Sequence, residues 1–253
     1  GDDTPVAVLS SHYRPVSHYF RQNFSQVTNP PIDSLRENKV MSLKTRFGNL
    51  GNILDFDNLT EENIYVLDSP ILTNSQFKKF KKFFSKKVKI IDCTFDIKSS
   101  LKNRIEAIRE ESETAVREGS SCLILSDKNI SNLKASIPSI LTVGAVHSHL
   151  VKHGLRGYCS LSVECSDALD THAFAVLIGV GATTVNPYLA IDSIYQRFEK
   201  KLFGKSDFET CVVKFKKSID AGLLKIMSKM GISVISSYRG GCNFEAVGLS
   251  RAI

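Results

Sequence analysis

Three histidines stand close together in the segment HSHLVKH, at positions 147, 149 and 153. His149 and His153 are four residues apart, so on a helix they share one face, as the paired histidines of metal sites do. No glutamate lies between them as in HExxH, and Glu164 or His172 could serve as a third ligand only if the fold brings it near. Gly154 follows directly, and a histidine at a helix end interacts favourably with the helix dipole. We therefore favour a helix end and expect no metal site, with His149 and His153 as the candidate ligands if one exists.

Two glycine-containing loops are candidates for binding an anionic cofactor. The first, GVGATTVNP at 179–187, offers Gly179, Gly181 and Asn186, but it lacks the third glycine of GxGxxG and follows a helical pattern. The second offers Tyr238 and Arg239 after an expected strand at 232–236, where α/β proteins bind ligands. Ordinary turns also explain both loops, the first as a helix end that leads into a strand.

The sequence contains no complete active site that we recognise. It has neither a GxSxG nor a Walker A motif, and neighbouring carboxylates such as Glu110 and Glu111 point in different directions on a helix. The six cysteines include no CxxC pair, which disfavours a zinc ribbon and favours buried, reduced thiols in a reducing compartment. We therefore predict no catalytic residues in this segment.

The composition is that of a globular chain, since 42% of the 253 residues are hydrophobic and 23% are charged. It excludes a disordered tail, and no apolar run reaches the roughly 18–20 residues of a membrane helix. The net charge of +7 admits a nucleic-acid or membrane partner, and the densest basic run is FKKFKKFFSKKVK at 77–89. Its phenylalanines recur at helical spacing, so we predict a surface helix with its aromatic face in the core.

From residue 64 onward, β-branched runs alternate with stretches of helical periodicity. The expected strands are 64–67, 88–95, 121–125, 158–163, 183–185 and 232–236, and the expected helices are 101–116, 137–152, 189–202 and 208–230. The strands are continuously apolar, which favours a parallel sheet covered on both faces. We predict an α/β fold, with a mostly parallel sheet and helices on both faces, either open or part of a barrel.

The first sixty residues have a different pattern and include four of the seven prolines. The stretch QVTNPPID at 26–33 cannot form a regular helix, because a residue before proline avoids the helical region. We predict that residues 1–60 form an extended arm with one helix around 18–24, and that residues 61–253 form the α/β domain.

Several long strings, in order along the chain, resemble the large subunit of glutamate synthase. They are GDDTPVAVLS at 1–10, FSQVTNPPIDSLRE at 24–37, VMSLKTRFGNLGNIL at 40–54, LDSPILTN at 67–74, VGAVHSHLVKHGLR at 143–156, HAFAVLIGVGATTVNPYLA at 172–190 and GLLKIMSKMGISVISSYRGGCNFEAVGLS at 222–250. The resemblance is to the central region of that protein, between its glutamine amidotransferase domain and its FMN-binding synthase domain.

This resemblance implies an oxidoreductase of ammonia assimilation and nitrogen metabolism, which makes glutamate from glutamine and 2-oxoglutarate. The whole flavoprotein uses FMN and a [3Fe–4S] cluster, and ammonia passes through an internal channel. The nucleophilic cysteine, the cluster cysteines and the FMN-binding stretch of the family lie outside the region matched here. The resemblance therefore implies an α/β central domain related to the barrel that follows it, inactive when isolated and without a cofactor of its own.

The implied partners are the amidotransferase and FMN synthase domains of the same polypeptide, and either a small NADPH-oxidising subunit or ferredoxin as electron donor. Neither nucleic acid nor a membrane is implied, and the location is the cytoplasm, or the plastid in a eukaryote. The alternative is a stand-alone basic α/β module that binds nucleic acid or an anionic ligand. Strongly salt-dependent binding to DNA would favour that alternative.

Overall fold

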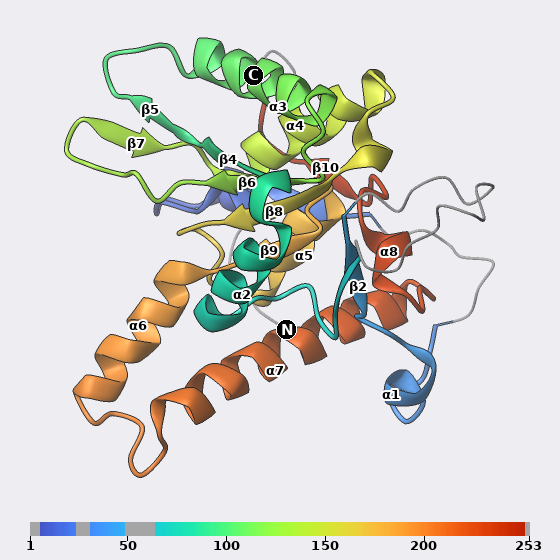
Figure 1. Cartoon of the computed structure of the whole chain (residues 1–253). Coiled ribbons are helices and arrows are strands. Elements are labelled where there is room, and N and C mark those ends of the chain that lie inside the picture. The colour runs from blue at the N-terminus through green and yellow to red at the C-terminus, as the bar shows by residue number, and fades with distance from the viewer. Residues whose placement is uncertain (1–5, 24–30, 49–63, 251–253) are drawn as a thin grey trace.

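The computed structural model describes residues 6–23, 31–48 and 64–250. At its centre lies a sheet of four parallel strands in the order β4-β6-β8-β9 (Figure 1). The strands are β4 (Val88–Asp92), β6 (Cys122–Ser126), β8 (Ser160–Glu164) and β9 (Thr184–Asn186). The parallel sheet predicted from the apolar runs is thus confirmed.

Helices connect these strands, because parallel neighbours need a crossover that returns the chain to the same edge of the sheet. The connecting helices are α3 (Leu101–Arg117), α4 (Ser139–Lys152) and α5 (Thr171–Gly179), and α6 (Tyr188–Glu199) and α7 (Phe208–Lys229) follow the last strand of the sheet. The side chains of Ser100, Asp170 and Asp207 accept backbone N–H bonds and so cap the starts of α3, α5 and α7. The expected helices therefore form within a few residues of their predicted bounds.

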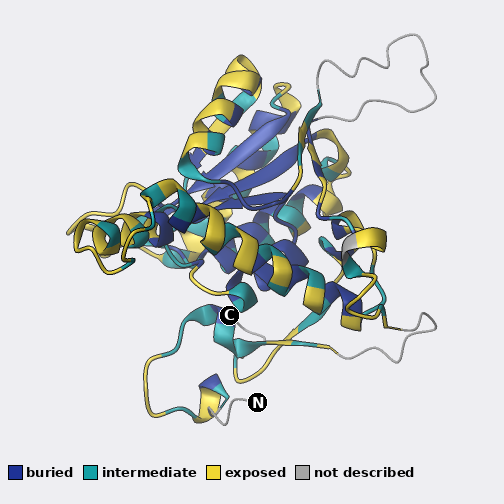
Figure 2. Ribbon diagram, turned by 90° about the horizontal axis from the view of Figure 1, so that it is seen from below, coloured by how far each residue is buried: buried dark blue, intermediate teal, exposed yellow. Residues whose placement is uncertain are grey.

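Both faces of the sheet are buried at strands β6, β8 and β9, whereas the edge strand β4 exposes Lys89 and Ile90. All residues of β6 are buried, and their side chains alternate between two hydrophobic clusters. Leu123 and Leu125 pack with residues of α3, α4 and α5, whereas Cys122 and Ile124 pack with the aromatic side chains of α2 (Asn74–Phe84). Figure 2 shows the buried strands between helices whose outer faces are exposed. The predicted α/β fold with both faces covered is therefore confirmed.

Helix α2 carries the basic run. Phe77, Phe80 and Phe84 are buried, and the ring centroid of Phe80 lies 4.8 Å from that of Phe47. The predicted aromatic core face is confirmed, but the helix ends at Phe84 and does not extend through the run. It ends there because Ser85 has a φ of 44°, after which a short 3-10 helix, η4 (Ser85–Lys87), leads into β4.

Short antiparallel pairs surround the main sheet. They join β1 (Phe20–Gln22) to β10 (Phe244–Ala246), β2 (Thr45–Phe47) to β3 (Tyr65–Leu67), and β5 (Thr94–Asp96) to β7 (Lys134–Ser136). The remaining short elements are η1 (Ala7–Leu9), η2 (Val16–Tyr19), α1 (Glu37–Val40), η5 (Arg156–Tyr158) and α8 (Ile235–Tyr238). The pairing of β1 with β10 places a part of the predicted arm against the last part of the chain (Figure 1).

Two local predictions are wrong. The helix expected around 18–24 is the short 3-10 helix η2 followed by β1, whose backbone is held by antiparallel pairing to β10. The strand expected at 232–236 is a single bridge between Ser42 and Val234, after which the chain turns into α8. In both places the backbone conformation is set by a contact with a residue far away in the sequence. A local sequence pattern contains no information on such a contact. Residues 1–5, 24–30 and 49–60 of the predicted arm lie outside the described residues.

The cysteines agree with the sequence prediction. All six cysteines are free thiols, and five of them are buried, as predicted for reduced structural cysteines. Burial raises the pKa of Cys159 to about 11, so this thiol is unreactive at neutral pH.

Among the described residues, none of the helices has the length and apolarity needed to cross a membrane.

Truncation of Phe80 to alanine tests the aromatic cluster under the sheet. Phe80 is fully buried, so Phe80→Ala should lower the free energy of unfolding by about 3–5 kcal/mol through lost contacts and a cavity. The matched control is Phe83→Ala on the same helix, where the ring is 45% exposed and a loss below about 1.5 kcal/mol is expected. Urea unfolding of the chain measures both, and equal losses would contradict the packing described here.

Candidate functional site

The carboxyl ends of the parallel strands carry polar side chains that form hydrogen bonds within the chain. The Ser126 hydroxyl donates to Oε2 of Glu164 at 2.7 Å, and Nζ of Lys128 donates to Oε1 of the same carboxylate at 3.3 Å. On the neighbouring strand, Nδ2 of Asn186 donates to the Leu72 carbonyl at 2.9 Å and to Oδ1 of Asn74 at 3.0 Å. Asn186, a sequence candidate for cofactor binding, is thus bound to the start of α2.

The residue after β6 belongs to the same edge. Asp127 is buried, and its Oδ2 accepts bonds from the backbone N–H of Ser166 at 2.9 Å and from its hydroxyl at 2.6 Å. Burial raises the pKa of this carboxyl, because the charged form loses its hydration. Hydrogen bonds within the chain therefore hold several side chains at the edge where α/β proteins usually bind ligands, while Oδ1 of Asp127 is buried with no hydrogen-bond partner among the described residues.

The two candidate glycine loops meet on one side of α4. A Cβ atom on Gly181 would overlap the ring of His147, and one on Gly240 would come within 3.0 Å of the His147 Cε1 atom. The N–H of Gly240 donates to the carbonyl of Ile178 at 3.2 Å, which fixes the second loop to the end of α5. Because Gly181 precedes β9, this meeting point lies at the amino ends of the strands. The expected position of the second loop, at the carboxyl end of a strand, is wrong, since α8 occupies that segment.

Arg156 holds this meeting point together. Its Nε donates to Nδ1 of His147 at 3.1 Å, Nη1 donates to the carbonyl of Cys159 at 2.6 Å, and Nη2 donates to the carbonyl of Gly181 at 2.9 Å. The planar guanidinium can serve these acceptors at the same time. It therefore fixes the segments that lead into β8 and β9 against helix α4.

The charges around His147 set its protonation state. Burial, followed by the positive charges of Arg156 and Arg239, lowers the pKa of His147 to about 4. The ring is therefore neutral at neutral pH, with Nδ1 as the acceptor of the Arg156 bond. Burial also lowers the pKa of Arg239, and no acceptor for its guanidinium is found in residues 6–23, 31–48 and 64–250.

The other two loop candidates, Gly179 and Tyr238, contribute to the packing of the domain. A Cβ on Gly179 would overlap the ring of Phe244, so this glycine permits close packing at the end of α5. Tyr238 is fully buried and lies edge-on to Phe244, with ring centroids 6.4 Å apart. Sequence reasoning did not select His147 or Arg156 here, although both lie in the string VGAVHSHLVKHGLR that carries the family resemblance.

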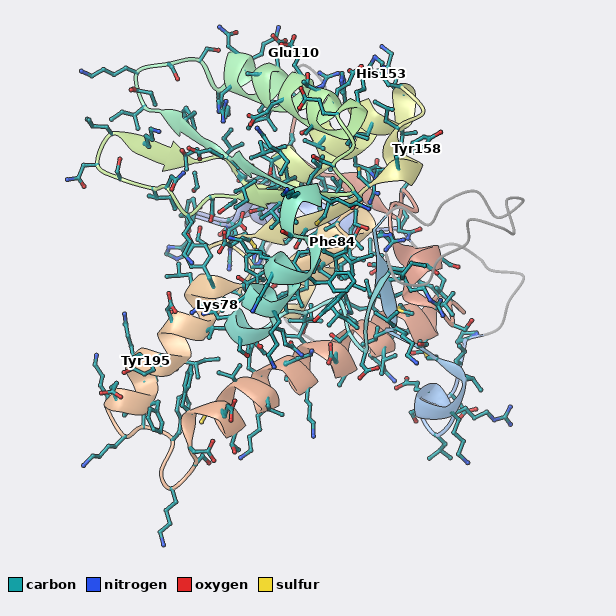
Figure 3. All side chains as sticks on the ribbon, in the orientation of Figure 1. Lys78, Phe84, Glu110, His153, Tyr158 and Tyr195 are labelled. Atoms are coloured by element: carbon teal, nitrogen blue, oxygen red, sulfur yellow. The ribbon has the colours of Figure 1, made fainter. Side chains whose placement is uncertain are left out.

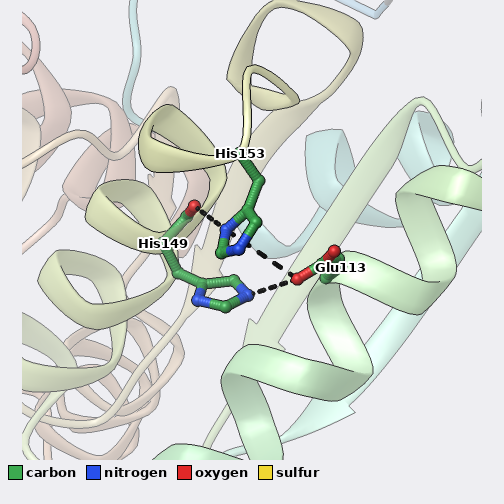
Figure 4. A group of neighbouring side chains, drawn as sticks. All are labelled: Glu113, His149 and His153. Carbon is green, nitrogen blue, oxygen red and sulfur yellow. Dashed lines mark hydrogen bonds and ion pairs between the residues drawn. The ribbon is translucent and has the colours of Figure 1, made fainter.

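The histidine pair lies where α4 meets α3, and a third group joins it (Figure 4). Nε2 of His149 lies 2.6 Å from Oε2 of Glu113, and Nδ1 of His153 lies 3.8 Å from the same oxygen. The expected third residues are elsewhere, because Glu164 belongs to the network at the carboxyl edge and His172 contacts the Ser17 carbonyl at 3.0 Å. The predicted helix end is confirmed, since α4 ends at Lys152 and the Nδ1–H of His153 donates to the carbonyl of His149 at 2.9 Å.

A family model described as the glutamate synthase central domain matches residues 1–250. The chain belongs to this family. The large chain of NADPH glutamate synthase from Azospirillum brasilense is 56% identical to it over 256 residues, which cover 100% of this chain and 17% of that protein. The chloroplastic ferredoxin-dependent glutamate synthase of Spinacia oleracea is 39% identical over 268 residues, covering 100% of this chain and 16% of that protein. The central domain described here thus spans about a sixth of the length of these relatives.

Solved structures also show similarity to the central domain. A mutant flavocytochrome b2 with benzoylformate has a TM-score of 0.45 and 16% sequence identity, and the match covers 66% of this chain and 37% of that one.

The stability of the central domain should depend on pH through His147. Its folded pKa of about 4 is below the ordinary 6.5, so between these values the unfolded chain binds the extra proton. Stability should therefore fall as the pH is lowered from 6.5 towards 4. Replacing the ring by His147→Asn, which keeps an acceptor for Arg156, should make the loss between these pH values smaller. Urea unfolding at several pH values measures this, with the exposed His12→Asn as control, and identical pH profiles would contradict the assignment.

Proposed function

We propose that this chain is the connecting domain of a glutamate synthase large chain, an oxidoreductase that makes L-glutamate from L-glutamine and 2-oxoglutarate. The observation that supports the proposal most is the family match over residues 1–250, together with 56% identity to a relative named as such a large chain. The domain's own contribution is positional. It holds the glutaminase and FMN synthase domains at a fixed separation and forms part of the wall of the ammonia channel.

Fixed separation matters because of the chemistry of ammonia. Ammonia released into water is diluted and protonated, whereas an enclosed path delivers it at a high effective concentration to the next site. A wall for such a path needs a rigid backbone, since a wall that fluctuates lets ammonia escape and water enter. The sheet with both faces packed and its strand starts tied by Arg156 has the required rigidity.

The domain itself contributes no catalytic residues in this proposal. The bonds of Ser126 to Glu164 and of Asn186 to Leu72 and Asn74 support this view, because they hold these side chains at the edge where a sheet of this kind would bind a substrate. FMN and the [3Fe–4S] cluster then belong to the rest of the large chain. The printed names of the relatives include both NADPH and ferredoxin types, so this domain is compatible with either electron donor.

Contact with neighbouring domains is supported by a groove of 1090 Å³ between α2, α6 and α7. Helices α6 and α7 project from the body of the molecule, and Tyr195 lies on the projecting part (Figures 1 and 3). The side chains of Tyr195 and Val213 are 49% and 46% exposed in or beside this groove. Exposed apolar side chains gathered in one place are typical of an interaction surface.

The alternative of a stand-alone nucleic-acid module has less support. Such a module would need the aromatic residues of the basic run at 77–89 to contact nucleic acid, but Phe77, Phe80 and Phe84 are buried in the core. Beside its lysines the helix therefore exposes one ring, Phe83, which is a small stacking surface for single-stranded nucleic acid. We place the domain in the cytoplasm, or in the plastid of a eukaryote, as the name of the spinach relative suggests for that protein.

Loosening the arm tests the positional role. In the whole large chain, replacing Pro30 and Pro31 by glycine removes two fixed φ angles from the predicted arm. Glutamine hydrolysis should then exceed glutamate synthesis, because ammonia is lost before it reaches the synthase site. Glutamine consumption and 2-oxoglutarate-dependent glutamate formation, measured in the same reaction, report the ratio.

The matched control for this experiment is Ser34→Gly, which introduces a glycine at a nearby exposed position and removes no proline. It should leave the two activities stoichiometric. If the proline variant also stays stoichiometric, the positional role assigned to the arm is wrong.

A further inference from the structure

Glu113, His149 and His153 form a cluster that no step of the proposed function uses. One ligand atom from each residue lies within 4.8 Å of the other two, and Figure 4 shows all three side chains directed toward one another. The cluster joins the last turn of α3 to the end of α4. We propose that it is a binding site for one divalent transition-metal ion of the zinc type.

The donor set fits this class of metal. Two imidazoles and one carboxylate are zinc ligands, and a site with three protein ligands keeps a fourth position for water. The ligand atoms around one tetrahedral zinc lie roughly 3.3 Å apart, given bonds of about 2.0–2.2 Å. Oε2 of Glu113 lies 2.6 Å from Nε2 of His149 and 3.8 Å from Nδ1 of His153, and one ligand atom from each residue lies within 4.8 Å of the other two. Small side-chain movements that bring Nε2 of His153 to the same point therefore complete the site.

A further group orients the carboxylate. Nε and Nη2 of Arg117 both lie 2.8 Å from Oε1 of Glu113, which leaves Oε2 directed toward the two histidines. On the other side, the Nδ1–H of His153 donates to the carbonyl of His149, so the proton of this ring is placed on Nδ1 and Nε2 keeps its lone pair. A histidine that donates to a backbone carbonyl while its other nitrogen stays free is the usual arrangement of a metal ligand.

The local field favours a cation. The carbonyl ends of α3 and α4 meet here, since the helices end at Arg117 and Lys152, and a helix C-terminus carries a partial negative charge. The Glu113 carboxylate in the last turn of α3 adds to this charge. Arg117 pairs with Oε1 of this carboxylate, so Oε2 faces the two histidines.

One feature limits the affinity. Binding through Nε2 of His149 places the proton of that ring on Nδ1, a buried nitrogen for which the described part of the chain supplies no partner. An unpaired buried N–H costs about 1–3 kcal/mol. The site should therefore bind zinc more weakly than the closed four-ligand sites of structural zinc domains.

Zinc titration of the chain tests the proposal. The chain is first freed of metal by a chelator, and Cys242→Ser removes the single exposed cysteine. Isothermal titration calorimetry with zinc chloride should show one equivalent bound. Glu113→Gln and His153→Gln should each weaken this binding by more than about tenfold, a loss that changes even in the outer shell of a metal site can produce.

The matched control is Glu110→Gln, which removes the same charge from an exposed position on the same helix and should leave binding unchanged. Circular dichroism of each variant shows whether it is folded. With cobalt as a spectroscopic probe, visible bands of a four-coordinate site without thiolate charge-transfer bands should appear and should be lost in Glu113→Gln. The proposal is overturned if the Cys242→Ser chain binds no zinc, or if Glu113→Gln and Glu110→Gln bind it equally.

Discussion

The structure depends on one constraint: a parallel sheet must be covered on both of its faces. Helices α3, α4 and α5 cover one face, as in any βα succession, but the other face is covered by α2 and the rings of Phe47 and Phe80. This covering brings the start of α2 against the carboxyl edge of the sheet, where Asn186 binds the Leu72 carbonyl and Asn74. The same packing that stabilises the sheet thus occupies the place where a ligand would bind. A fold that usually supports catalysis is in this way suited to a positional role.

Much of this fold could be predicted from residue patterns. The βα alternation, the aromatic core face of α2 and the turn from α5 into β9 depend on spacing within a few residues, and all three are observed. The strand predicted at 232–236 does not form, because within the described residues its one bridge partner is Ser42, nearly two hundred residues away in sequence, and the pairing ends after Val234. The prediction of a helix at 18–24 was wrong for the same kind of reason, because part of this segment is strand β1, which pairs with β10. Local patterns carry no information on such long-range partners.

The candidate sites show the same limit. The i, i+4 pair of His149 and His153 is visible in the sequence, whereas Glu113 lies 36 residues before His149 and joins it only because α3 packs on α4. Likewise, Gly181 and Gly240 were parts of separate loops until the fold placed both against His147. Arg156, whose contacts explain this meeting, has no recognisable motif around it. Recognition of such a residue requires the three-dimensional arrangement of its acceptors.

The central claim is that this domain works as a connecting part of a much larger flavoenzyme. The most direct test is the intact mass of the native polypeptide, recovered from its source with an antibody against this chain. The account predicts a yellow, flavin-containing polypeptide several times heavier than 28.0 kDa. Recovery of a colourless species of 28.0 kDa would contradict it.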